Sequence, residues 1–164
     1  MKRECDAFYP EPFSCLHKVN SNMVPMTFHG MRMLDRLWAA GCAVPPLKST
    51  NGDATVLLET MPGAVLRVFK LPFKGYKNGA NAMELRRRIL DGLPKRSGLS
   101  LPNLDEYRDI CMSSHDGLDA VVAAIAAALW VIDSGMFRHP PASGETVQLE
   151  GWLYAPAFID LPAS

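Results

Sequence analysis

The chain has 164 residues, of which 48% are hydrophobic and 21% are charged, and its formal net charge is +0. These values suit one folded domain, residues 1–164, and exclude an intrinsically disordered protein. The zero net charge hides an asymmetry, because residues 67–96 hold nine Lys or Arg and two acids, whereas residues 97–164 hold nine acids and two Arg. The basic segment is suited to contact a polyanion, and a solvated helix face is the alternative interpretation.

Two features predict a soluble cytoplasmic protein with no membrane partner. The N-terminal sequence MKRECD mixes charges of both signs and is not followed by the apolar stretch of a signal peptide. The uncharged apolar run from Ala120 to Ile132 has 13 residues and is too short to span a bilayer.

In chain order, residues 1–53 are expected to form an irregular segment and one helix, MTFHGMRMLDRLWAAG, whose methionines fill the core. The segment ATVLLET then predicts a short buried strand that ends near Glu59. Further helices are predicted over residues 62–69, 81–93, 101–112 and 113–135, and a last strand over 147–156. This order indicates an α/β protein with few strands.

Three carboxylates occupy positions of interest. Glu59 ends the buried strand, where α/β folds place ligands, although its charge also suits the N-terminus of the next helix. Asp116 and Asp119 are three residues apart and share one helix face. Capping by Ser113 or Ser114 and the helix dipole explain Asp116 well. They explain Asp119 less well, because it enters the apolar run and needs a partner.

Carboxylate oxygens are the ligands that Mg²⁺ and Mn²⁺ prefer, so Glu59 with Asp119 or Asp116 could form part of a metal site for phosphoryl transfer. We prefer Asp119 as the ligand. His115 could carry a proton or support the ligands there, and simple capping of the helix is the alternative.

The loop KGYKNG contains groups that suit nucleic acid. Lys74 and Lys77 could bind backbone phosphate and Tyr76 could stack on a base, whereas an ordinary polar loop is the alternative. The glycines do not follow the order of a P-loop, and neither G-x-S-x-G nor G-x-G-x-x-G occurs.

Four segments occur in a particular order: LLETMPGAVLRVFKLPFKGYK (57–77), LRRRILDGL (85–93), SSHDGLDAVVAAIAAAL (113–129) and EGWLYAP (150–156). Together they resemble an uncharacterised family of predicted nucleases with a ribonuclease H-like fold. In that family a Glu-x-x-Pro closes a strand, a Tyr-Lys follows, a His-Asp-x-x-Asp-Ala opens the last helix, and Glu-Gly-Trp begins the last strand. The matching residues here are Glu59, Pro62, Tyr76, Lys77, His115, Asp116, Asp119, Ala120, Glu150, Gly151 and Trp152.

The resemblance implies a partial ribonuclease H-like fold over residues 54–157, with central strands flanked by helices. It implies a metal-dependent nuclease that acts on nucleic-acid phosphodiesters. Mg²⁺ or Mn²⁺ would bind at Glu59, Asp119 and Asp116, with His115 beside them. The basic segment would contact phosphate, and its candidate substrate-binding residues are Lys74, Tyr76, Lys77, Arg86 and Arg87.

The chain departs from that family in one respect. The fold begins with three antiparallel strands, the first of which carries an essential aspartate, and nothing before residue 54 reads as that set. We therefore expect weak or absent catalysis, and self-association into a homo-oligomer through an exposed sheet edge. The missing part could lie outside the given chain, be lost in a degenerate copy, or come from a partner chain. The alternative function is a non-catalytic oligomeric or nucleic-acid-binding protein.

Overall fold

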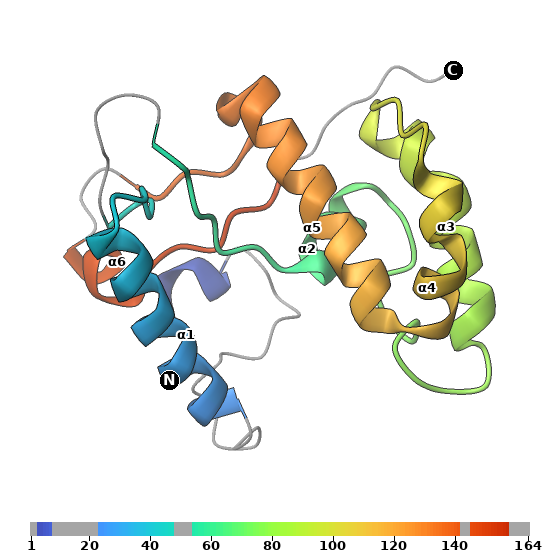
Figure 1. The fold of residues 1–164 in the computed structure, drawn as a ribbon, viewed down its shortest axis with the longest axis horizontal. Coiled ribbons are helices and arrows are strands. Elements are labelled where there is room, and N and C mark those ends of the chain that lie inside the picture. The colour runs from blue at the N-terminus through green and yellow to red at the C-terminus, as the bar shows by residue number, and fades with distance from the viewer. Residues whose placement is uncertain (1–2, 8–22, 48–53, 142–144, 158–164) are drawn as a thin grey trace. The chain divides into compact units, whose positions relative to one another are not determined.

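A computed structural model of the protein describes residues 3–7, 23–47, 54–141 and 145–157 (Figure 1). The chain divides into two compact units. Unit 1 combines residues 1–59 with 139–153, and unit 2 combines residues 60–138 with 154–164. Buried hydrophobic side chains occur in both units.

Unit 1 contains the 3-10 helix η1 (Glu4–Ala7) and the helices α1 (Met23–Ala39) and α6 (Glu145–Glu150). The N–H of Glu4 donates to Glu150 Oε2 over 2.9 Å and joins η1 to α6. Gly151 ends α6 at a φ of 72°, a conformation that favours glycine, and its N–H donates to the Val147 carbonyl. The buried hydrophobic residues of this unit are Cys5, Ala43, Val44, Val147, Trp152 and Leu153.

The helix predicted around residues 26–41 is confirmed as α1, but its apolar side chains do not fill a core. Phe28 is 61% exposed, Met31 60% and Met33 58%. The prediction that the methionines of this helix are core residues is therefore wrong for Met31 and Met33.

The predicted α/β class, with a partial ribonuclease H-like fold and central strands, is wrong. The described residues contain helices and no strand, only the isolated bridges Ala43–Val56, Glu59–Leu153 and Phe137–Pro156. The predicted strand over 147–156 begins instead as helix α6, and the predicted strand at 54–60 makes single bridges at Val56 and Glu59. A strand needs neighbouring strands to pair along its length, and the apolar runs find none here.

Unit 2 is a group of helices around α5 (His115–Ile132). Helix α5 contacts α2 (Pro62–Val68), α3 (Ala82–Ser97), α4 (Arg108–Ser113) and the 3-10 helix η3 (Ser134–Met136). A further 3-10 helix, η2 (Leu104–Tyr107), leads into α4. The buried side chains include Val65, Leu66, Phe69, Tyr76, Ile89, Leu90, Leu93, Cys111, Leu118, Val122, Ile125 and Leu129. The helices predicted over 62–69, 81–93 and 113–135 are thus confirmed as α2, α3 and α5, whereas the one predicted over 101–112 is α-helical only from Arg108, after the 3-10 helix η2.

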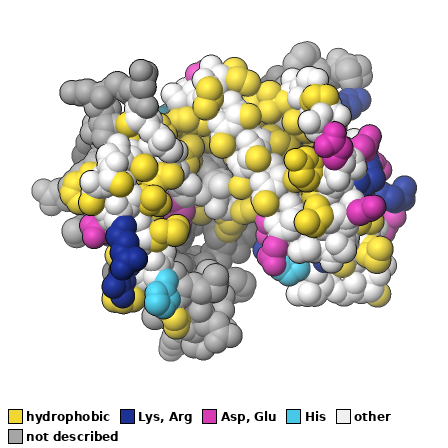
Figure 2. Space-filling model, viewed as in Figure 1, with side chains coloured by type: hydrophobic (Ala, Val, Ile, Leu, Met, Phe, Trp, Pro, Cys, Tyr) yellow, Lys and Arg dark blue, Asp and Glu magenta, His cyan; other side chains and the backbone are white. Residues whose placement is uncertain are grey.

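Helix α5 is apolar beyond the face that it buries. Its side chains Leu118, Val122, Ile125, Ala126 and Leu129 are buried. Its exposed residues include Ala120, Ala124, Ala127, Ala128, Val131 and Ile132, and Figure 2 shows apolar side chains spread over this helix. By length and composition α5 could cross a membrane, with a mean hydropathy of 1.6 over 18 residues, and the core helix of a soluble protein passes the same test.

Tyr154 is expected to make the stability of the protein decrease at alkaline pH. Its ring lies 5.0 Å from that of Trp130, and burial raises the pKa of its phenol to about 12. An unfolded tyrosine ionises near pH 10, so the unfolded state loses this proton first. The contribution of Tyr154 is therefore fully present below pH ~10 and decreases as the pH rises toward 12.

We expect Tyr154→Phe to make the loss of unfolding free energy between pH 10 and 11.5 less steep, as measured by urea unfolding. Tyr107→Phe changes a tyrosine that is 53% exposed and serves as the control. Equal pH profiles for the Tyr154→Phe variant and the unmodified protein would contradict this role.

Candidate functional site

The N-terminus of α5 gathers three potential metal ligands. Ser114 is the N-cap, and its Oγ accepts hydrogen bonds from the backbone N–H groups of Asp116, at 3.2 Å, and Gly117, at 3.4 Å. His115 and Asp116 occupy the first turn of the helix, and Asp119 follows one turn later on the same side. One ligand atom from each of His115, Asp116 and Asp119 lies within 4.8 Å of the other two.

The histidine and its neighbour lie close together without forming a good hydrogen bond. His115 Nδ1 is 3.0 Å from Asp116 Oδ1, an ion pair only when the imidazole is protonated. Nδ1 is also a buried atom with no hydrogen-bond partner among the described residues. The Asp116 side chain is 85% exposed, so it is free to turn. The imidazole of His115 is one of the three groups that could hold a metal ion.

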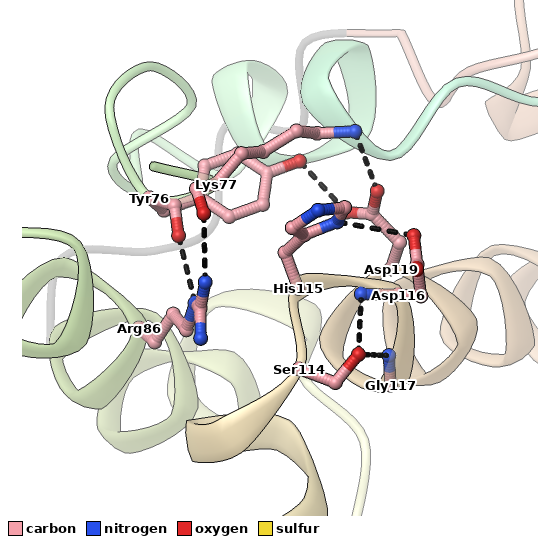
Figure 3. Close-up of polar contacts among 8 residues, drawn as sticks. All are labelled: Tyr76, Lys77, Arg86, Ser114, His115, Asp116, Gly117 and Asp119. Carbon is pink, nitrogen blue, oxygen red and sulfur yellow. Dashed lines mark hydrogen bonds and ion pairs between the residues drawn. The ribbon is translucent and has the colours of Figure 1, made fainter. Parts of the chain in front are cut away.

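Asp119 has the protein partners that its place beside the apolar run requires. The Tyr76 hydroxyl donates to its Oδ1 over 2.7 Å, and Lys77 Nζ donates to its Oδ2 over 2.8 Å (Figure 3). The carboxylate is 17% exposed and the lysine side chain 52%. Burial, followed by the hydrogen bond to Asp119, raises the pKa of Tyr76 above its usual value. The phenol therefore stays protonated and acts as a donor.

Arg86 lies behind the Tyr76–Lys77 pair. This residue of α3 is 7% exposed, and its guanidinium donates to the backbone carbonyls of Tyr76, Lys77 and Met112 over 2.7–2.8 Å. Its neighbour Arg87 is exposed and forms a bidentate ion pair with Glu84. The two arginines expected to bind substrate thus have very different surroundings.

The other two predicted site residues, Lys74 and Glu59, have different contacts. Lys74 Nζ lies 5.5 Å from the centre of the Phe73 ring, a cation–π contact. Glu59 belongs to unit 1, where both of its carboxylate oxygens accept hydrogen bonds from Arg3 Nη1, at 2.7 and 2.9 Å. Its expected convergence with Asp116 and Asp119 stays a prediction.

Two features of the site were missed at the level of the sequence. Tyr76 was assigned to substrate, although a buried tyrosine hydroxyl usually has a protein partner. Arg86 was likewise assigned to substrate, although it shares the helical spacing of the buried residues Ala82, Ile89 and Leu93.

The described part of the chain is largely helical, and one histidine and two aspartates at the start of α5, His115, Asp116 and Asp119, form a triad that could hold a metal ion. The chain belongs to the family described as "Protein of unknown function (DUF429)", whose profile matches residues 17–145, more than half of the sequence. The described site lies inside this range. No curated protein and no solved structure matches the chain.

Proposed function

We propose that this protein is a nuclease that depends on Mg²⁺ or Mn²⁺ and hydrolyses nucleic-acid phosphodiesters at His115, Asp116 and Asp119. The observation that carries the proposal is the meeting of two motifs 42 residues apart, since Lys77 contacts Asp119 directly. An acidic cluster alone would attract only a cation. A lysine and a tyrosine beside it add donors for a phosphate group.

The ligand set fits one divalent cation. Mg²⁺ holds its ligands at about 2.0–2.1 Å, so two ligand atoms of one ion lie at most about 4.2 Å apart. The three side chains approach this limit, with ligand atoms within 4.8 Å of one another, and small rotations would close the difference. The imidazole nitrogen favours Mn²⁺, because transition metals accept nitrogen ligands more readily than Mg²⁺ does.

Charge supports phosphate binding only when a cation is present. The Asp116 and Asp119 carboxylates and the Lys77 ammonium together leave one net negative charge, which repels a phosphodiester. A divalent cation would reverse this to one net positive charge. We therefore expect nucleic acid to bind at this site in a metal-dependent way.

When bound, the cation would act as a Lewis acid that favours ionisation of water and stabilises charge on phosphate oxygens. Tyr76 stays protonated and holds Asp119 Oδ1 in place. Lys77 is half exposed, so its ammonium can turn from Asp119 toward a phosphate oxygen. We expect slow cleavage. The described residues offer one cluster of three metal ligands, and a two-metal site requires more ligands than that.

A second function, nucleic-acid binding without cleavage, is favoured by the exposure of the basic segment. The exposed cations in residues 67–96 are Lys70, Lys74, Lys77, Arg87, Arg88, Lys95 and Arg96. Such side chains neutralise phosphates without any need for a metal. Binding of this kind would weaken steeply with added salt and persist in EDTA.

The test uses the full chain with Mn²⁺ or Mg²⁺. Calorimetry measures metal binding, and end-labelled single- and double-stranded DNA and RNA report cleavage and binding. We expect one Mn²⁺ per chain and slow, EDTA-sensitive cleavage. Asp109→Asn, which changes an exposed acid of α4 outside the cluster, should leave both unchanged.

Absence of Mn²⁺ binding would refute the metal site and the nuclease with it. Metal binding without cleavage, together with salt-sensitive retention of nucleic acid in EDTA, would support the second function instead. The distinction matters because both functions use the same basic segment.

We also propose a cytoplasmic location and a homo-oligomer. Support for the oligomer comes from the exposed apolar side chains of α1, Phe28, Met31 and Met33. Sedimentation velocity on the purified protein measures the assembly state, and a monomer at all concentrations would refute the oligomer.

A further inference from the structure

Arg86 has an unusual place for a charged side chain. It lies in the N-terminal half of α3 with 7% exposure, and its hydrogen-bond acceptors among the described residues are three backbone carbonyls. A buried charge is costly unless hydrogen bonds replace its hydration. The three bonds are short, at 2.7–2.8 Å, which is the range of charge-assisted hydrogen bonds. The side chain is therefore well held.

The three carbonyls belong to the two segments that build the candidate site. Nε and Nη2 bind the carbonyls of Tyr76 and Lys77, whose side chains reach Asp119. Nη1 binds the carbonyl of Met112 in the last turn of α4, two residues before the N-cap Ser114 of α5. Figure 3 shows Arg86 on the side of Tyr76 and Lys77 away from Asp119.

We propose that Arg86 is a positioning residue that sets the distance between the Tyr76–Lys77 segment and the start of α5. It thereby keeps the Tyr76 hydroxyl and the Lys77 ammonium on the two oxygens of Asp119. The expected effect of Arg86 on metal binding rests on the proposed function. Arg86 itself would touch neither the metal nor the substrate.

The chemistry of arginine explains why this residue suits the position. A planar guanidinium presents its N–H groups in a fixed fork, so it can bind carbonyls of two segments at once in one geometry. The last carbonyls of α4 have no partner inside the helix, and Arg86 satisfies that of Met112. A lysine carries the same charge but offers a flexible point donor. Substitution of Arg86 by lysine therefore keeps the positive charge but removes the planar fork of N–H donors that binds the three carbonyls.

The test compares Arg86→Lys and Arg86→Met with Arg108→Lys, which changes an arginine outside the basic segment that pairs with the exposed carboxylates of Asp91 and Asp105. The methionine variant avoids an unpaired buried charge should the lysine variant unfold. Thermal unfolding establishes that each variant is folded, and calorimetry measures Mn²⁺ affinity. NMR of protein labelled with ¹³C at the Cζ of tyrosine gives a resonance for Tyr76, which is assigned by its loss in Tyr76→Phe. The Asp119→Asn variant gives the chemical shift of this resonance when the hydrogen bond from Tyr76 to the carboxylate is absent.

For a folded Arg86 variant we expect Mn²⁺ affinity to fall about 10- to 100-fold, as for residues that orient metal ligands elsewhere. We expect the Tyr76 resonance to move toward its position in Asp119→Asn, while the Tyr154 resonance stays in place. Arg108→Lys should match the unmodified protein in Mn²⁺ affinity and in the Tyr76 resonance. A general loss of structure would move Tyr154 as well.

A folded Arg86→Lys or Arg86→Met variant with an unchanged Tyr76 resonance would overturn the proposal. Failure of both variants to fold would also overturn it, because the role would then be structural. If the unmodified protein binds no Mn²⁺, the proposed function fails, but the Tyr76 resonance still decides whether Arg86 holds the Tyr76–Asp119 contact.

Discussion

Asn in place of Asp119 is expected to lower Mn²⁺ affinity by at least about 100-fold, since loss of a residue that merely orients a ligand already costs about 10- to 100-fold. The substitution removes one of the two carboxylates in the cluster and one negative charge. It also offers an amide N–H₂ group to one of two donors, Tyr76 or Lys77, where the carboxylate accepts from both. Calorimetry with Mn²⁺ measures the affinity.

The same substitution should lower the unfolding free energy by about 1–3 kcal/mol, because a part-buried hydrogen bond to a charged acceptor is weakened. Asp116→Asn is the matched control, because its side chain is 85% exposed and makes no comparable contact with the loop. We expect it to lower the unfolding free energy by less than about 1 kcal/mol, the usual contribution of an exposed acid to the helix dipole, and to weaken Mn²⁺ binding less. An Asp119→Asn variant that binds Mn²⁺ like the unmodified protein would remove Asp119 from the site.

Local sequence patterns were sufficient to predict the helices of unit 2. Pro62 stands at the first position of α2, and Ser114 is the N-cap of α5, as the sequence indicated. Helix α3 is longer than predicted, because it passes Pro94 and ends at Gly98, which has a φ of 70°. Such signals lie within a few residues of the helix end that they determine, so they can be read without the fold.

The strands could not be predicted in this way. An apolar run such as ATVLLET has the composition of a buried strand, but a strand also requires partners distant in the sequence. Here Val56 and Glu59 each form one bridge, and Val56 is 44% exposed. The strand prediction for residues 147–156 is wrong for the same reason, because its first residues form helix α6 and do not pair with another strand.

The site was predictable in part. Asp119 has partners beyond helix capping, as its place before the apolar run predicted, and these are Tyr76 and Lys77. Which partner it takes depends on how α3, α4 and α5 pack, and this packing is not encoded in local spacing. Arg86 was more accessible to sequence reasoning, since a cation on the apolar stripe of α3 signals a buried and paired charge.

Leu118→Ala should lower the unfolding free energy of the protein by about 2–5 kcal/mol, because it removes a fully buried side chain and leaves a cavity. Ile132→Ala, on the same helix, removes a side chain that is 65% exposed and should change it by less than about 0.5 kcal/mol. Urea unfolding followed by circular dichroism measures both. Because α5 is apolar on most of its circumference, hydropathy alone does not identify its buried face, and the two substitutions test it directly. Similar losses for both variants would mean that the Ile132 end of α5 is covered as well, and the face of α5 assigned here to solvent would then be part of a packed interface.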